Sequence, residues 1–430
     1  MYKKISQLKS FLDNAKSVYH GVALLQNMLK TSGYQKLDES EAWQLTPGGK
    51  YYTVRGGSAI IGFQVPESTP AGFMISASHS DRPTFKVKEN GEIAGKYTQL
   101  STEKYGGMLI APWLDRPLSI AGRVLIETEK GIESRLVDID RDLLLIPNVA
   151  IHLNRKANEG IAWNPAVDTL PLMGNANAKG KLFPLIEKEA GGKILGHDLY
   201  LYVRQQASVW GMEEAFISAA ALDDLLCAWC CTQGFLAAQA TKAVPVLCVF
   251  DSEEVGSCSA QGAASTFLED TLERICDSFG WSKKQLISGS FMVSADNAHA
   301  LHPNHPEYSD ANSAPIMGRG VVLKFNAAQR YTTDGVSAAI FRKICAAADV
   351  PVQTYYNRAD LPGGSTLGNI SLSHISVPTA DIGIPQLAMH SCYETAAVED
   401  IAHMEAAMTS FYSTVLDGEY ALQTDSCQND

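Results

Sequence analysis

The second half of the chain repeats one pattern, in which a short apolar run is followed by a polar loop and then by a helix-like segment. The apolar runs cover 244–250, 290–295 and 321–325, and the helix-like segments include 222–240 and 335–348. Such runs are typical of strands buried on both faces of a parallel sheet, and Asp334 is placed to cap the helix that follows it. The alternation predicts an α/β domain with a mostly parallel sheet flanked by helices.

The first part of the chain carries signals of the same kind. Apolar residues recur at helical spacing over 8–25, which predicts one amphipathic helix. Residues 51–65 are typical of a β-hairpin with its turn at 55–58, and 73–77 of a short buried strand. We expect these elements to belong to the same α/β domain.

Between these two parts the texture of the sequence changes. Short β-like runs alternate with turns rich in Gly and Asn, and the runs include 118–126, 143–146 and 198–203. We interpret residues 91–212 as a β-rich domain inserted into the first one. Residues 1–90 and 213–430 would then form the main α/β domain.

The net charge and the cysteines indicate which binding partners suit this protein and which cellular compartment it occupies. Lys and Arg number 35 against 47 Asp and Glu, a net charge of -12, which argues against nucleic-acid binding. No stretch approaches the roughly 18 apolar residues of a membrane span, and the N-terminus shows no apolar signal core. Several of the nine cysteines lie within apolar runs, which favours free thiols and a cytoplasmic location.

Acidic and imidazole side chains stand where the apolar runs end or where a helix begins. The residues concerned are His79, Asp81, Asp223, Glu253, Glu254, Asp296 and His390. In sheets of this type, ligands bind at the carboxyl ends of the strands. We therefore expect these side chains to converge on one site.

Five of these side chains suit a metal centre, namely His79, Asp223, Glu254, Asp296 and His390. Two imidazoles and three carboxylates match a pair of Zn²⁺ ions with one bridging carboxylate and an open position on each ion. Such a pair holds a hydroxide nucleophile and stabilises the oxyanion that develops on a peptide carbonyl. The pattern favours a metal-dependent hydrolase with two Zn²⁺ per subunit, for which other divalent metals could substitute.

Two further carboxylates stand beside these candidate ligands. Glu253, next to Glu254, is placed to take and return the proton of the attacking water. Asp81, two residues beyond His79, suits a group that fixes the imidazole tautomer. Each signal alone has a structural explanation, since a single His is usually structural and an acidic residue before a helix is usually a cap. Their combination at the ends of apolar runs, where charges are unfavourable, favours the metal site.

Longer motifs around these positions resemble a known family. They are WQLTPGGKYY at 43–52, SHSD at 78–81, DSEEVGS at 251–257, SADNAHALHPN at 294–304 and PQLAMHS at 385–391. In this order they are similar to the aspartyl aminopeptidases, the M18 zinc metallopeptidases, over nearly the whole chain. The resemblance implies a dinuclear zinc exopeptidase fold for the catalytic domain and a preference for peptides with acidic N-terminal residues. It also implies that Asp223 bridges two metals, that His79, Glu254, Asp296 and His390 complete the ligands, and that Glu253 is the general base.

The inserted region resembles the β-rich dimerisation domain of that family. In the family this domain helps to build a homo-oligomer, a hollow tetrahedral dodecamer. The segment IPNVAIHL at 146–153 is similar to one that supplies a histidine to the active site of a neighbouring subunit. The resemblance therefore implies that His152 acts across a subunit interface.

The chain also departs from the family pattern. Asp224 follows the bridging residue where familiar members have Asn, and SCYE at 391–394 stands in place of Ser-Ile-Arg-Glu. The missing arginine leaves acidic and neutral N-terminal residues as alternatives. Lys324, in an apolar strand, matches a substrate-pocket position, and Arg330 is a weaker second candidate. His299 and His302 either reach the cleft or stand as polar residues on its wall.

Other motifs have plainer interpretations, and rival functions stay open. Cys227 and Cys230 lie on an apolar helix without a partner pair, which favours core packing over a metal site. The loop 361–366 lacks the lysine of a P-loop, so a substrate-backbone or oxyanion loop is favoured. A deacylase or carboxypeptidase could use a similar site, and a catalytically silent assembly protein could keep the fold.

Overall fold

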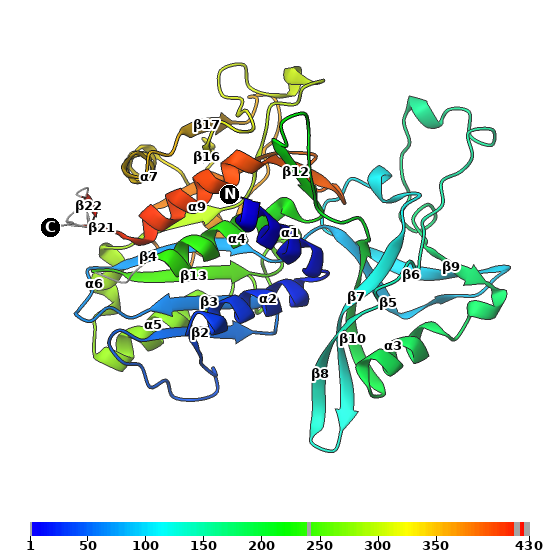
Figure 1. Cartoon of the computed structure of the whole chain (residues 1–430), viewed down its shortest axis with the longest axis horizontal. Coiled ribbons are helices and arrows are strands. Elements are labelled where there is room, and N and C mark those ends of the chain that lie inside the picture. The colour runs from blue at the N-terminus through cyan, green and yellow to red at the C-terminus, as the bar shows by residue number, and fades with distance from the viewer. Residues whose placement is uncertain (1, 239–241, 417–421, 425–430) are drawn as a thin grey trace.

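The computed structural model describes residues 2–238, 242–416 and 422–424. Two sheets dominate it, one of nine strands and one of six, and they lie side by side (Figure 1). The nine-stranded sheet and its helices form the larger part, which carries both ends of the described chain.

The nine-stranded sheet is mixed, with a parallel centre. Its order is β1 (Gln35–Lys36), β2 (Lys50–Arg55), β3 (Ala59–Gln64), β13 (Val244–Phe250), β4 (Phe73–His79), β14 (Phe291–Ala295), β18 (Thr379–Gly383), β16 (Val321–Phe325) and β17 (Val352–Tyr356). The central strands β13, β4, β14 and β18 run parallel, whereas β3 and β16 run opposite to the centre. The predicted mostly parallel α/β sheet is confirmed.

Helices cover both faces of this sheet. One face carries α1 (Tyr2–Asn14), α2 (Val18–Thr31), α4 (Leu222–Ala237), α7 (Gly335–Ala347) and α9 (Val398–Tyr412), and the other carries α5 (Phe267–Phe279), α6 (Lys283–Ser288) and α8 (Leu367–Ser371). Alternate residues of each strand enter the two cores, so Val249 packs on the first face and Cys248 on the second. Helix α7 begins with the predicted cap, because the Asp334 side chain accepts from Ser337 N.

The single helix predicted over 8–25 is wrong, because the chain breaks between α1 and α2. Ser17 is extended, and its hydroxyl lies 2.8 Å from Nδ1 of His20. The apolar residues of both helices pack into the same core, so the hydrophobic spacing runs on through the break. The helix predicted over 222–240 ends at Ala237, and residues 239 and 240 lie outside the described residues.

The six-stranded sheet is antiparallel throughout. Its order is β8 (Gly131–Asp138), β7 (Leu118–Thr128), β10 (Ile194–Val203), β5 (Thr84–Ile93), β6 (Tyr97–Tyr105) and β9 (Leu172–Asn175), and α3 (Leu182–Ala190) shares its core. The first strand of this sheet begins at Thr84 and the last one in the chain ends at Val203, whereas the predicted insertion covers 91–212. The bounds of the inserted domain therefore stay a prediction. Residues 144–146, predicted as part of a strand, form isolated bridges.

A third, five-stranded sheet joins the end of the interval 91–212 to the part of the chain that forms the nine-stranded sheet. Its order is β11 (Ser208–Trp210), β12 (Phe216–Ala219), β20 (Glu394–Ala397), β19 (Pro385–Leu387) and β15 (Ala298–His299). The remaining short elements are β21 (Thr414–Leu416), β22 (Leu422–Thr424), and the 3-10 turns η1 (Ala111–Trp113), η2 (Ala157–Glu159), η3 (Ala176–Ala178), η4 (Glu253–Val255) and η5 (Pro306–Tyr308). The five-stranded sheet places the segments around residues 222, 299 and 390 beside one another.

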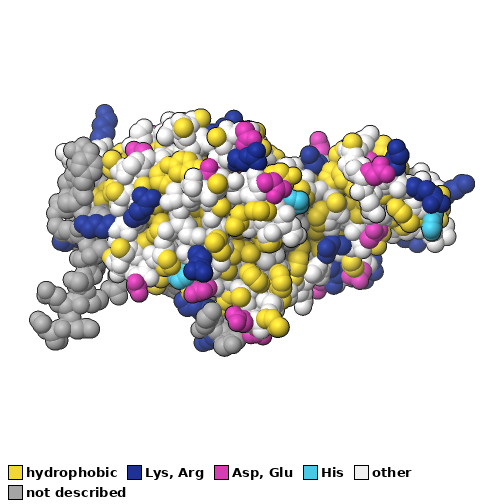
Figure 2. Space-filling model, turned by 90° about the horizontal axis from the view of Figure 1, so that it is seen from above, with side chains coloured by type: hydrophobic (Ala, Val, Ile, Leu, Met, Phe, Trp, Pro, Cys, Tyr) yellow, Lys and Arg dark blue, Asp and Glu magenta, His cyan; other side chains and the backbone are white. Residues whose placement is uncertain are grey.

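Charges of both signs are spread over the surface. The face in Figure 2 shows Lys and Arg interspersed with Asp and Glu among apolar side chains, and no continuous basic stripe crosses it. Within the described ranges, no helix combines the length and the apolar character needed to cross a bilayer.

Candidate active site

The carboxyl ends of the central parallel strands carry the acidic and imidazole side chains. His79 is the last residue of β4, Asp296 directly follows β14, and Glu253 and Glu254 lie in η4, just after β13. Asp223 lies at the start of α4, where the backbone is still non-helical, so its side chain reaches the sheet edge. The structure thus brings side chains from distant parts of the chain to one edge of the sheet.

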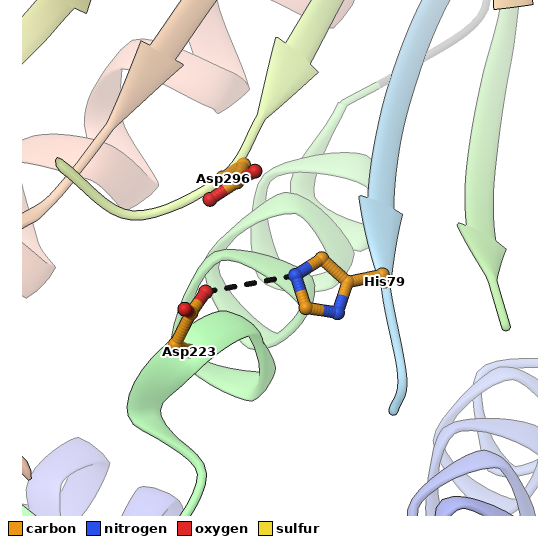
Figure 3. A group of neighbouring side chains, drawn as sticks. All are labelled: His79, Asp223 and Asp296. Atoms are coloured by element: carbon orange, nitrogen blue, oxygen red, sulfur yellow. Dashed lines mark ion pairs between the residues drawn. The ribbon is translucent and has the colours of Figure 1, made fainter. Parts of the chain in front are cut away.

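The candidate ligands form two groups that share Asp223. His79, Asp223 and Asp296 make one group, and Asp223, Glu254 and His390 make the other, with potential ligand atoms within 4.8 Å of one another in each. Nε2 of His79 lies 3.5 Å from Oδ1 of Asp223, and Nε2 of His390 lies 3.4 Å from Oδ2. Figure 3 shows the first group converging from β4, the start of α4 and the loop after β14. Asp223 therefore presents one carboxylate oxygen to each group.

The donor set of both groups fits divalent cations. Oδ1 of Asp223 and Oε1 of Glu254 are buried and have no hydrogen-bond partner. Burial and the neighbouring Asp223 carboxylate raise the pKa of Glu254 and of Asp296. Buried carboxylates that repel one another need positive charge between them, and nitrogen and oxygen donors of this kind suit zinc.

Asp81 positions neighbouring groups through both of its carboxylate oxygens. Its Oδ1 accepts from the backbone N–H of Glu253 at 3.1 Å, and its Oδ2 accepts from that of Glu254 at 3.1 Å. Nδ1 of His79 lies 3.4 Å from Oδ1 of Asp81, and the Tyr105 hydroxyl donates to Oδ2 at 2.7 Å. Asp81 thus orients the His79 ring and the residues of η4 together.

Two further contacts, which the sequence motifs did not single out, hold His390. Its Nδ1 lies 2.6 Å from the carbonyl oxygen of Gly107, so that Nε2 is left to face Asp223 and Glu254. The fully buried Glu394 accepts from the backbone N–H of His390 at 2.8 Å and from that of Asp223 at 2.9 Å. The pair Gly106–Gly107 lies against the site, where a Cβ on Gly106 would meet Glu254 at 3.2 Å.

The loops that carry these groups include left-handed residues other than glycine. Ala221 has φ 57°, Ser252 has φ 65° and His390 has φ 66°. Such conformations are unfavourable for side chains with a Cβ and persist where the surrounding structure holds them. They occur here next to the converging side chains.

A cavity of about 170 Å³ opens over the cluster. Glu253 lines it, and burial raises the pKa of Glu253 to about 8. Gly364, Ser365 and Thr366 also line it, which places the loop predicted over 361–366 at the cavity. The cavity therefore joins the candidate metal ligands, the Glu253 carboxyl group and a polar loop.

Lys324 also lines this cavity, although its strand runs opposite to the centre of the sheet. It is buried, and its ammonium donates to the carbonyl oxygen of Asp296 at 2.8 Å and lies 3.7 Å from Oδ1 of Asp296. The ring of Tyr331, which the sequence motifs did not single out, lies 5.2 Å from Nζ and shares the cavity wall. In the sequence, a single lysine within an apolar strand was the local signal that pointed to this part of the cavity wall.

The other predicted side chains lie at different distances from the cavity. His299 lines it from its exposed rim, whereas His302 packs against His305 and does not line it. Arg330 is exposed and donates to the Gly363 carbonyl oxygen at 2.6 Å, so it supports the loop and does not line the cavity. His152 lies on the exposed loop of the insertion, away from the cavity of its own chain. Cys227 and Cys230 are buried in the core.

Comparisons with known proteins point to one family. The family model described as Aminopeptidase I zinc metalloprotease (M18) matches residues 11–412. A probable M18 family aminopeptidase 2 of Clostridium acetobutylicum is 40% identical over 423 residues, which cover 95% of this chain and 98% of the relative. The protein of the same name in Pseudomonas putida is 40% identical over 417 residues, covering 94% and 97%.

Solved structures show the same fold. A chain from the cryo-EM structure of the Ape4 and Nbr1 complex superposes with a TM-score of 0.91 at 36% identity, covering 94% of this chain and 84% of that chain. A chain of the S. cerevisiae mApe1 dodecamer superposes with a TM-score of 0.83 at 26% identity, covering 96% and 97%.

Proposed function

The chain belongs to the M18 family of zinc metalloaminopeptidases, and from this premise we propose that each subunit uses two Zn²⁺ ions to remove acidic N-terminal residues from peptides. The observation that carries the proposal is the sharing of Asp223 between two groups of candidate ligands. A carboxylate with one oxygen facing each group suits a bridge between two ions. His79 and Asp296 would hold one ion, and Glu254 and His390 the other.

The proposed mechanism assigns a separate task to each part of the site. The bound ions would activate a water molecule and stabilise charge on the peptide carbonyl oxygen. Glu253 would accept the proton of that water and deliver it to the leaving amine. Asp81 would keep His79 and the Glu253 backbone in place, since its carboxylate contacts both.

Lys324 supports the proposed acidic preference. A substrate carboxylate that leaves water needs a cation or strong donors. The Lys324 ammonium has three N–H groups, and two carbonyl oxygens, of Asp296 and Asn297, lie within 3.4 Å of it. The ammonium also lies 3.7 Å from Oδ1 of Asp296 and 5.2 Å from the centre of the Tyr331 ring, and Lys324 lines the cavity, so its charge is within reach of a substrate carboxylate bound there.

We expect Lys324→Met, which keeps the length of the side chain, to reduce the preference for acidic residues. The ratio of kcat/KM for Asp over Ala aminoacyl substrates should fall about 10- to 100-fold, the value of a hydrogen bond to a charged group. Arg330→Gln is the matched control and should leave the ratio unchanged, because Arg330 does not line the cavity. A wild-type enzyme that prefers Leu or Ala would refute the acidic preference and favour the neutral alternative.

We also propose that the chain assembles into a homo-oligomer, a dodecamer as in the S. cerevisiae mApe1 structure, in the cytoplasm. The loop that carries His152 exposes large apolar side chains, with Val149 57% and Leu153 84% accessible. Exposed apolar side chains of this size often mark an interface. Every cysteine in the described part of the chain is free, as expected in a reducing compartment.

Mixing two inactive variants tests whether His152 serves a neighbouring site. His152→Ala and Glu253→Gln subunits, mixed under exchange conditions, should regain part of the activity, because some sites then combine an intact Glu253 with a neighbour's intact His152. The control mixes Glu253→Gln subunits with His390→Ala subunits. This mixture should stay inactive, because each change inactivates the site of the chain that carries it. Light scattering should show a large assembly; an active monomer, or no recovery despite proven exchange, contradicts the proposal.

A further inference from the structure

A second cavity lies on the opposite side of Asp223, where the insertion meets the main part. It is lined by the turn between α1 and α2, by the end of β10, by Trp113 and by the segment 219–221 that leads into Asp223. Its free space is small, since about 40 Å³ can hold the centres of water molecules, which is room for a few waters or one small ion. No candidate metal ligand other than Asp223 lines it.

Three donor groups line this cavity without a hydrogen-bond acceptor among the described residues. The half-buried Arg82 guanidinium makes no hydrogen bond to a described residue, although burial lowers its pKa and the charges of Glu394 and Asp81 raise it. The Lys16 ammonium contacts only the ring of Tyr202, at 4.9 Å from its centroid. Trp113 is 3% exposed, and its indole Nε1 has no partner. The indole N–H is therefore buried without an acceptor, which is unfavourable, whereas Lys16 and Arg82 are half-buried. An acceptor placed among the three donors would satisfy the indole N–H and lie beside both cations.

The acids that line the cavity are already engaged. Asp13 accepts from the Ala207 backbone N–H at 2.7 Å. Glu394 accepts from the backbone N–H groups of Asp223 and His390, and Asp223 faces the two imidazoles. Burial lowers the pKa of Arg82 to about 10, so its guanidinium stays charged at neutral pH. Arg82, Lys16 and Trp113 are therefore donors without a hydrogen-bond partner, and Asp223, whose Oδ1 also has none, faces the imidazoles of the metal site.

We propose that this cavity binds one small oxyanion or carboxylate, held by Arg82, Lys16 and the Trp113 indole N–H. A guanidinium presents paired N–H groups that match the two oxygens of a carboxylate. The anion would join the α1–α2 turn, the insertion and the strand end that precedes Asp223. It would therefore stabilise the junction behind the metal centre without contacting the substrate, independently of the proposed function.

Thermal unfolding of the metal-loaded enzyme in formate, and separately in phosphate, tests the proposal. Ionic strength is held constant with a bulky sulfonate that exceeds the cavity. We expect the Tm to rise with the logarithm of the concentration for at least one of the two anions, by about 3 °C at a hundred times Kd. The absence of such a rise with either anion would overturn the proposal and leave the cavity to water.

Variants locate the effect within the enzyme. Arg82→Gln should abolish the rise, and Trp113→Phe, which removes the N–H donor together with part of the ring, should weaken the apparent affinity about tenfold. Arg319→Gln is the matched control, because Arg319 is exposed, does not line the cavity and undergoes the same change of charge. If Arg82→Gln does not fold, Trp113→Phe still decides. A response in these variants equal to that of the wild type would place the anion elsewhere, for example at the metals, and overturn the proposal.

Discussion

Replacement of Glu253 by glutamine is expected to lower turnover by about 10²- to 10⁴-fold while the metal content stays at the wild-type level. The amide keeps the shape of the side chain but cannot accept the proton of the attacking water. Glu253 belongs to neither group of candidate ligands, and its backbone N–H is held by Asp81 whatever its side chain. The metals and the assembly should therefore survive the change.

Steady-state kinetics, metal analysis and light scattering on the same preparation check this result. Glu273→Gln is the matched control, since Glu273 is an exposed carboxylate on α5, and this variant should behave as the wild type. Retention of more than about a tenth of the wild-type turnover by Glu253→Gln would show that Glu253 is not the general base.

Loss of Asp223 is expected to have the largest effect on the metals. Because Asp223 belongs to both groups of candidate ligands, Asp223→Ala should weaken the binding of both ions, whereas His390→Ala should affect mainly one. Activity should fall by about 10³-fold or more, because the stabilisation that metals supply amounts to several kcal/mol. Zinc per subunit, measured by elemental analysis after dialysis, should be about two in the wild type.

Asp224→Asn is the control for this experiment. Asp224 is the neighbour of Asp223 and is equally buried, and its Oδ2 accepts from the His79 backbone N–H at 3.2 Å. An asparagine oxygen can accept the same hydrogen bond, so both ions should remain. A wild-type enzyme with a single zinc, or an Asp223→Ala variant that keeps both, would contradict the proposed bridge.

Local signals predicted the strands and the chemistry at their ends. The apolar run that ends at Phe250 and the cap at Asp334 depend on neighbours within a few residues, so they can be recognised without the fold. The break between α1 and α2 was not predicted, because both helices face one core and share one hydrophobic spacing. The reversed direction of β16 was not predicted either, because strand pairing is a contact between distant segments.

The amino-acid sequence by itself determined the α/β class, the order of the elements and the residue types that gather at the strand ends, because these follow from periodicity and from the free energy of burying charge. Only the tertiary structure decided that Asp223 faces both groups, that Gly107 and Glu394 hold His390, and that Arg82 and Trp113 line one cavity. Gly107 and His390 are 283 residues apart, so their contact depends on how distant segments of the chain pack together. No local pattern encodes such a contact, since it arises only when the sheets pack against each other.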